Sequence, residues 1–123
     1  MPQKSSIVCI VDDDSSILLA LDSLLRSLGL KVKTFQNPRR FLEYAKEGAA
    51  SLVIVDVGMP ELNGLEVQTI LRSVNPRLPI IMMTGQYLPD TEKIALAQGA
   101  IAFLVKPFSD LALIRAINKV LPS

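Results

Sequence analysis

The 123-residue sequence contains no histidine and only one cysteine, Cys9. Without histidine, a zinc site built from cysteine and histidine ligands is excluded. A single cysteine cannot form a disulfide within the chain, so the composition is compatible with a reducing cytoplasm. Cys9 lies inside an apolar run, and we expect it to be a small buried side chain.

A strong net charge and long apolar runs are also missing. The 13 basic and 12 acidic residues leave a formal net charge of +1, which gives no argument for binding nucleic acid or an acidic membrane. No apolar run approaches the roughly 20 residues that span a bilayer, and residues 1–6 lack the apolar stretch of a signal peptide. We therefore expect a soluble, cytoplasmic protein that contacts neither nucleic acid nor a membrane directly.

Half of the residues are hydrophobic, which is enough for the core of one domain at this length. Short apolar runs, four or five residues long, predict strands buried on both faces of a parallel sheet. These runs are residues 7–11, 52–55, 80–83 and 102–105. Residues 31–35 alternate between polar and apolar side chains, which is typical of an edge strand.

Apolar residues at helical spacing fill the intervals between these runs. The positions that mark the five helices are Ile17, Leu21, Leu24, Leu25 and Leu28; Phe41, Leu42 and Ala45; Leu65, Ile70, Leu71 and Val74; Ile94, Ala95, Leu96 and Ala97; and Leu113, Ile117, Val120 and Leu121. Pro38 is placed to open the second helix and Ser109 to cap the fifth. Five repeats of strand and helix predict one doubly wound α/β domain over residues 1–123, with helices on both faces and no output domain in this chain.

Polar residues follow four of the five predicted strands directly. They are Asp12, Asp13 and Asp14; Asp56; Thr84; and Lys106. Ligands of open α/β sheets bind outside the carboxyl ends of the strands, so we expect these side chains to converge. Clustered carboxylates repel one another, and Mg²⁺ relieves the repulsion because it prefers oxygen ligands. Mg²⁺, Lys106 and Thr84 together can hold the oxygens of a phosphoryl group during its transfer. The carboxylate of Asp56 can then attack the phosphorus atom.

At this point the chain resembles the response-regulator receiver domains of two-component signalling, over its whole length. The matching segments are Val11-Asp12-Asp13, Asp56-Val57-Gly58-Met59-Pro60, Asn63-Gly64, Met83-Thr84-Gly85 and Phe103-Leu104-Val105-Lys106-Pro107-Phe108. The resemblance implies a flavodoxin-like (βα)5 fold with a five-stranded parallel sheet of order 2-1-3-4-5. Residues 99–108 are similar to the nitrogen-fixation-regulator type of receiver, whose members often carry a DNA-binding output domain.

The resemblance also implies a role for each site residue. Asp56 is the phosphoacceptor and a metal ligand, Asp13 binds Mg²⁺ directly, Asp12 acts mainly through a metal-bound water, and the carbonyl of Gly58 is a further ligand. Mn²⁺ is expected to substitute for Mg²⁺. Thr84 binds the phosphoryl group and carries the switch.

Lys106 then pairs with a phosphoryl oxygen, and its bond to Pro107 is expected to be cis. Phe103 is the switch aromatic, although its interpretation as a plain core residue stays open. Asp14 is either a charge at a helix N-terminus, which we favour, or a group behind the metal ligands.

The implied function is that of a signalling phosphoacceptor, not a conventional enzyme. A histidine kinase or histidine phosphotransfer protein donates the phosphoryl group. The surface of the fourth helix, fifth strand and fifth helix then changes, to control an output domain in a longer chain, a partner or a homodimer.

Three other classes are weighed against it. A degenerate receiver that works without phosphate conflicts with the intact set of acids, Thr84 and Lys106. A haloacid-dehalogenase-type phosphatase would leave Asp56 without a role. A flavin carrier would need a first loop rich in hydroxyl groups and glycine, whereas this loop is acidic.

Overall fold

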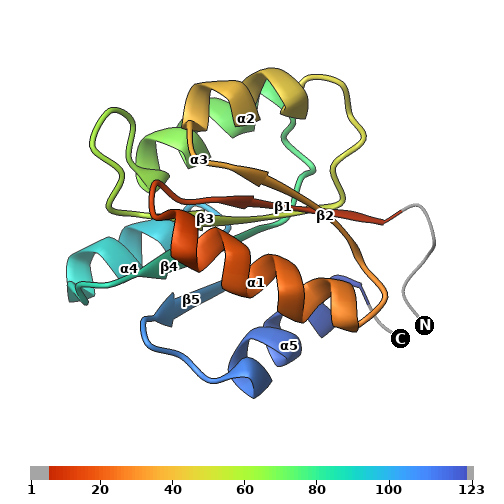
Figure 1. Cartoon of the computed structure of the whole chain (residues 1–123). Helices are drawn as coiled ribbons and strands as arrows, with labels where there is room; N and C mark the ends of the chain where they lie inside the picture. Colours follow the sequence, from red (N-terminus) through yellow and green to blue (C-terminus); the bar gives the residue numbers. More distant parts are fainter. Residues whose placement is uncertain (1–5, 122–123) are drawn as a thin grey trace.

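The computed structural model describes residues 6–121, which form five strands alternating with five helices (Figure 1). The strands are β1 (Ile7–Val11), β2 (Lys31–Phe35), β3 (Leu52–Asp56), β4 (Ile80–Thr84) and β5 (Ala102–Val105). The helices are α1 (Ser15–Ser27), α2 (Pro38–Ala45), α3 (Gly64–Val74), α4 (Pro89–Ala97) and α5 (Asp110–Asn118). The predicted order of elements is confirmed. β3 and β4 each run one residue beyond their apolar runs, because Asp56 and Thr84 still pair with the neighbouring strand.

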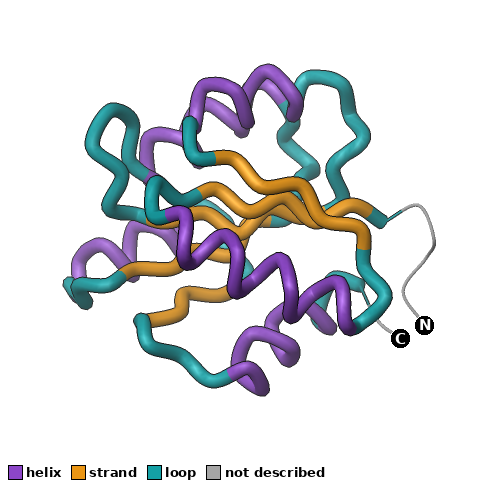
Figure 2. Tube along the Cα trace, in the orientation of Figure 1, coloured by secondary structure: helices purple, strands orange, loops and turns teal. Residues whose placement is uncertain are grey.

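All neighbouring strands are parallel, in the order β2-β1-β3-β4-β5, which confirms the flavodoxin-like topology. β2 lies at one edge, as its alternating sequence predicted. The direction of winding reverses between β1 and β3, so the loops after these two strands diverge and leave room for a ligand. Helices α1 and α5 cover one face of the sheet, and α2, α3 and α4 cover the other (Figure 1 and Figure 2).

Two apolar clusters, one on each face of the sheet, form the core. Successive side chains of a strand point to opposite faces, so β1 contributes to both clusters. Cys9 and Val11 pack toward α2 and α3, whereas Val8 and Ile10 pack toward α1 and α5, and all four are fully buried. This burial on both faces is the physical reason for the continuous apolar runs.

Local capping sets where the helices begin. Pro38 occupies the first turn of α2, as predicted. At the start of α3 the Asn63 side chain accepts a hydrogen bond from the Glu66 N–H at 2.9 Å, and Glu66 accepts one from the Asn63 N–H at 3.0 Å. The Ser109 hydroxyl accepts a hydrogen bond from the Ala112 N–H at 3.0 Å and caps α5, also as predicted. These bonds satisfy N–H groups that a helix cannot pair internally.

One strand is less buried than its sequence predicts. Residues 102–105 form a continuous apolar run, yet β5 is partly exposed along its length, and 38% of Val105 is accessible to solvent. The reason is its position, because β5 is the second edge of the sheet and pairs only with β4. An apolar run therefore does not distinguish a central strand from this edge.

Five of the positions that marked the helices are exposed and not on a buried apolar face: Leu28, Ile70, Ile94, Leu96 and Ala97. Val67 of α3 and Ala95 of α4 are buried, and Leu28, Val120 and Leu121 lie after the ends of their helices. α4 packs beside β5, a short edge strand that covers it incompletely. Within residues 6–121, none of the helices has both the length and the apolar character that crossing a membrane requires.

Candidate functional site

The predicted site residues converge beyond the carboxyl ends of the strands. Asp12 follows β1, Asp56 ends β3, Thr84 ends β4, and Lys106 follows β5. Together with Asp13 and residues of the loops after β3 and β4, they line a cavity of about 480 Å³. The strand register brings them together, since Asp56 pairs with Met83, directly before Thr84. Sequence order alone predicted this convergence.

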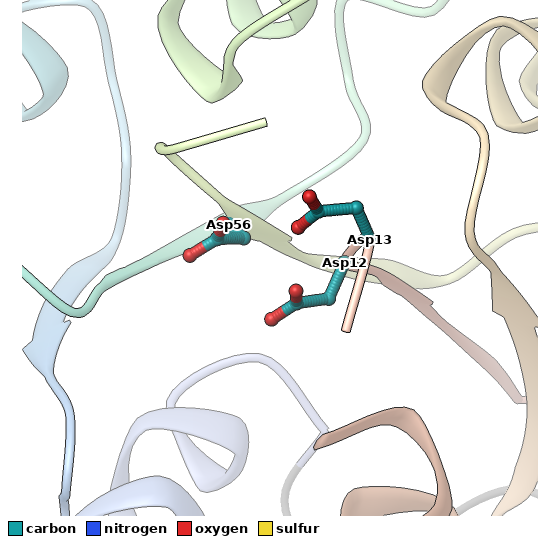
Figure 3. Close-up of side chains that lie close together, drawn as sticks. All are labelled: Asp12, Asp13 and Asp56. Atoms are coloured by element: carbon teal, nitrogen blue, oxygen red, sulfur yellow. The ribbon is translucent and has the colours of Figure 1, made fainter. Parts of the chain in front are cut away.

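Three carboxylates form the acidic side of the cavity (Figure 3). Oxygen atoms of Asp12, Asp13 and Asp56 lie within 4.8 Å of one another. Asp12 and Asp56 are only 1% and 6% exposed, whereas Asp13 is exposed to solvent. Such a set of oxygen donors, partly open to water, suits a hard divalent cation that keeps several of its own waters.

Lys106 lies against two of these acids. Its Nζ donates hydrogen bonds to Asp12 Oδ2 at 2.8 Å and to Asp56 Oδ1 at 2.9 Å. The bond between Lys106 and Pro107 is cis, as expected. Burial acts to lower the pKa of Lys106, but the hydrogen bonds to Asp12 and Asp56 outweigh it, and the pKa lies above its usual value. The ammonium group is therefore charged at neutral pH.

The environment of Asp56 disfavours the ionised form of its carboxyl group. Burial raises its pKa, Lys106 acts against this rise, and the neighbouring Asp12 adds to it; the net pKa lies above the usual value. The N–H of Gly58 donates a hydrogen bond to Asp56 Oδ2 at 3.2 Å. Desolvation thus dominates over the one cation in contact, so a second positive charge would stabilise the ionised acid.

The Thr84 hydroxyl is buried and bonded to the following loop. It donates to the carbonyl of Gln86 at 2.9 Å and accepts from the Gln86 N–H at 3.2 Å. Thr84 therefore lines the cavity while its hydroxyl holds the turn between β4 and α4. The sequence predicted the place of Thr84 but not this partner, because the partner atoms belong to the backbone.

Gly64 has a role that sequence analysis missed. Asn63 and Gly64 suggested a turn before the third helix, and Gly64 is the first residue of α3. A Cβ atom at Gly64 would lie 2.8 Å from the carbonyl oxygen of Asp56 and 2.9 Å from Cα of Val57. The missing side chain lets α3 approach the backbone at the end of β3. The glycine is visible in the sequence, but the close backbone contact that requires it is not.

Phe103 lies in β5, partly buried against the core, and its nearest aromatic neighbour was not predicted. The ring of Tyr87 meets it edge-on, with 6.4 Å between ring centroids. The Tyr87 hydroxyl donates a hydrogen bond to Glu92 Oε1 at 2.7 Å, in the first turn of α4. Tyr87 thus connects the predicted switch aromatic to α4.

Asp14 takes the role that we favoured for it, at the start of a helix. Its carboxylate accepts hydrogen bonds from the N–H and the hydroxyl of Ser16, at 2.9 and 2.6 Å, and caps α1. Both bonds lower the pKa of Asp14, and the bond from the Ser16 hydroxyl has the larger effect. Its own N–H donates to Asp12 Oδ1 at 2.9 Å, so the capped turn also fixes the Asp12 carboxylate.

Known proteins share this arrangement of sequence and fold. The family model of the response regulator receiver domain matches residues 8–118. The response regulator protein TmoT of Ectopseudomonas mendocina is 42% identical over 122 residues, which are 98% of this chain and 55% of TmoT. The solved structure of the response regulator StyR is 38% identical, with a TM-score of 0.86, over 94% of this chain and 59% of that one. The FixJ-N structure is 30% identical, with a TM-score of 0.86, over 94% and 92%.

These similarities extend over nearly all of this chain but not over all of its relatives. The chain spans about half the length of the first curated relatives that it matches. The match of the family model covers the strands, the acidic cluster and Lys106 alike. The chain therefore belongs to the response-regulator receiver domains of two-component signalling.

Proposed function

We propose that Asp56 accepts a phosphoryl group from a phosphohistidine of a histidine kinase or of a histidine phosphotransfer protein. A carboxylate oxygen of Asp56 forms a bond to phosphorus while the phosphorus–nitrogen bond of the donor breaks, and the imidazole leaves. Water later cleaves the acyl phosphate to inorganic phosphate and the free carboxylate. Residues 1–123 contain no histidine, so the phosphohistidine lies outside this segment.

The observation that carries this proposal is the position of Lys106 between Asp12 and Asp56. The ammonium group lies beside the nucleophile, where an arriving phosphoryl oxygen would share it. Thr84 is buried on the neighbouring strand, and its hydroxyl can donate to a second oxygen once it leaves the Gln86 carbonyl. Lys106 is fixed before the reaction, and such a donor stabilises the charge that develops in phosphoryl transfer.

The cluster also fits a resident Mg²⁺, with Mn²⁺ as a substitute. We assign Asp12, Asp13 and Asp56 as its carboxylate ligands or ligands through water, and the carbonyl of Gly58 as a backbone ligand. The fit rests on two observations. The clustered ligand atoms are all oxygens, and the pKa of the buried Asp56 is raised, mainly by desolvation. When bound, the cation supplies positive charge to the carboxylates and the phosphoryl oxygens.

The switch that we propose begins at Thr84. To donate its hydroxyl to a phosphoryl group, Thr84 must give up the carbonyl of Gln86, which frees the loop before α4. Phe103 then turns inward, and the surface of α4, β5 and α5 changes. Exposed apolar side chains on this surface suit a partner, an output domain or a second copy of the chain; they are Leu88, Ile94, Leu96 and Val105.

The names of the relatives suggest the kind of output that this receiver controls. One of them is named a transcriptional regulatory protein, ZraR of Klebsiella oxytoca, of which the match covers 23%. We propose that this receiver, residues 1–123, controls such an output in a longer chain or a separate partner, and that it acts in the cytoplasm. It assists its own phosphorylation and dephosphorylation and is not a conventional enzyme.

Mass spectrometry after incubation with a small-molecule phosphodonor tests the phosphoacceptor. With Mg²⁺ we expect one added phosphoryl group that hydroxylamine removes, as expected of an acyl phosphate. Asp56→Asn and chelation of the metal should each abolish the addition. Addition to Asp56→Asn, or none to the wild type with any donor or kinase, overturns the proposal.

The switch has its own test, which uses Thr84→Ala. The variant keeps Asp56, Lys106 and the acidic cluster, so it should still be phosphorylated. We expect the amide NMR signals of α4 and β5 to respond to phosphorylation in the wild type but not in Thr84→Ala. An unchanged response in the variant contradicts the role of Thr84.

A further inference from the structure

Helix α4 is weakly held by apolar packing. Ala95 is its buried residue, whereas Ile94 and Leu96 are 44% and 45% exposed. At its start, Leu88 provides no side-chain hydrogen bond as a cap. Leu88 and Thr91 line the cavity around Asp56, so this loosely held end forms a wall of the site.

A buried amide holds the other end of α4. Gln68 of α3 is fully buried, and its Nε2 donates a hydrogen bond to the carbonyl oxygen of Ala95 at 2.9 Å. The same carbonyl accepts the N–H of Ala100 at 3.0 Å, where the chain turns toward β5. One oxygen atom thus joins α3, the last turns of α4 and the approach to β5.

The amide of Gln68 costs the fold stability at this buried position. Its Oε1 is buried and has no hydrogen-bond partner within residues 6–121. A buried polar atom without a partner destabilises the fold, and an apolar side chain of similar size would avoid that cost. The benefit of glutamine here therefore lies in where it holds α4, and not in added stability.

We propose that Gln68 is a positioning residue, the pivot about which α4 turns when Asp56 is phosphorylated; this rests on the proposed function. Both links from α3 reach the C-terminal end of α4. Gln68 bonds to Ala95, and the Thr69 hydroxyl, which also donates to the Leu65 carbonyl at 3.0 Å, lies 3.4 Å from Oε1 of Gln98. Once Thr84 releases the Gln86 carbonyl, the end near the site can swing about these links. Seven residues separate Leu88 from Ala95, about 10 Å of helix, so a tilt of about 10° moves the first turn by about 2 Å.

Heteronuclear NMR of the wild-type chain tests the pivot directly, with beryllofluoride and Mg²⁺ as the probe. We expect the amide signals of Leu88 and Thr91 to shift strongly. The side-chain amide of Gln68 should keep its shift and its slow exchange with solvent, because the pivot stays closed in both states. Loss of that protection, or equal shifts along all of α4, overturns the pivot.

Hydrogen exchange in Gln68→Met supplies a second test. Methionine has the length of glutamine without its polar atoms, so the midpoint of urea unfolding should not fall. Exchange of the Gln98, Gly99 and Ala100 amides should nevertheless become about tenfold faster, because the helix end loses its buried hydrogen bond. Thr69→Val, which removes the exposed link, is the matched control and should change exchange less than twofold.

The outcomes separate the two proposals. If beryllofluoride fails to bind, the proposed function fails, and exchange in the free protein still decides whether Gln68 holds α4. If it binds but Gln68→Met leaves exchange in α4 unchanged, the pivot is wrong and the proposed function stands. A uniform rise of exchange in every element would show that Gln68 merely stabilises the fold, which also overturns the pivot.

Discussion

Lys106 Nζ lies 2.9 Å from Oδ1 of Asp56, although 50 residues separate the two in sequence. The ammonium also touches Asp12 and offsets the repulsion between two buried carboxylates. Removing one partner of a buried ion pair leaves an uncompensated charge, which is more costly than losing an exposed pair. This relationship makes the stability of the domain depend on the same side chain as the proposed phosphoryl transfer.

Lys106→Met should therefore destabilise the metal-free domain by about 3 kcal/mol in urea unfolding. Mg²⁺ should recover part of this loss by supplying positive charge to the same carboxylates. The phosphorylation rate should fall about 100-fold, as expected when one preorganised donor is removed. Lys46→Met is the control, because the Lys46–Glu43 pair is exposed and should contribute less than about 1 kcal/mol. A loss no larger than that of the control would contradict the ion-pair account.

Gly64→Ala tests the close approach of α3 to the backbone of Asp56. Alanine is a better helix former than glycine, by up to about 1 kcal/mol inside a helix, so a loss of stability at this first helical position must come from the contact. Since the obstructing atoms belong to the backbone, we expect a loss of about 1–3 kcal/mol and a slower phosphorylation of Asp56. Gly85→Ala, whose Cβ would meet nothing within 4 Å, is the control for stability. Equal unfolding midpoints for the two variants would refute the argument.

Much of the site could be predicted because it depends on chain order and on the apolar runs that mark buried strands. Apolar runs identify strands, parallel strands end at one edge, and the residue after each run must lie there. Asp12, Asp56, Thr84 and Lys106 all came from this rule. The capping roles of Pro38 and Ser109 were also readable, since a helix start has a local signature.

The remainder depends on contacts between distant segments, which a single sequence does not encode locally. The run at residues 102–105 looks the same at an edge as in the centre of a sheet. Ile94 and Leu96, which helped to predict α4, are surface residues, because the edge strand β5 leaves this side of the helix open. Gln68 reads as a polar surface residue of a helix, and only its hydrogen bond to Ala95 shows otherwise.

Cys9 should make the stability of the domain depend on alkaline pH. Burial raises the pKa of its thiol from 9.0 to about 12, with Lys33 acting to lower it. The folded state therefore keeps the proton where the unfolded state has lost it. The free energy of unfolding is unaffected below about pH 9 and falls by up to about 1.4 kcal/mol per pH unit between the two pKa values.

Urea unfolding between pH 8 and 11 should show this slope as the difference between the wild type and Cys9→Ala, because other groups titrate equally in both proteins. The native thiol should also resist alkylation at pH 8 and react only after unfolding. Parallel pH profiles of the two proteins, or rapid alkylation of the native chain, would show that Cys9 is not buried as described.

Tyr87 should report the switch by its fluorescence. The chain has two tyrosines and no tryptophan, so in Tyr44→Phe the emission comes from Tyr87 alone. The ring of Tyr87 packs against Phe103, and its hydroxyl is bonded to Glu92, a carboxylate that quenches tyrosine emission. In the proposed switch Thr84 releases the Gln86 carbonyl, so the segment that carries Tyr87 loses its anchor. We therefore expect the emission to rise on addition of beryllofluoride and Mg²⁺.

Two variants make this measurement specific. Tyr87→Phe, in which only Tyr44 emits, should show no change, because Tyr44 lies beside Phe35 of β2, at the opposite edge of the sheet from β5. Thr84→Ala in the Tyr44→Phe background should bind beryllofluoride without the rise, since the hydroxyl that links the site to the loop is gone. A rise that persists without the Thr84 hydroxyl would mean that the signal reaches Tyr87 by another route, with the metal cluster and the turn after β3 as the next segments to vary.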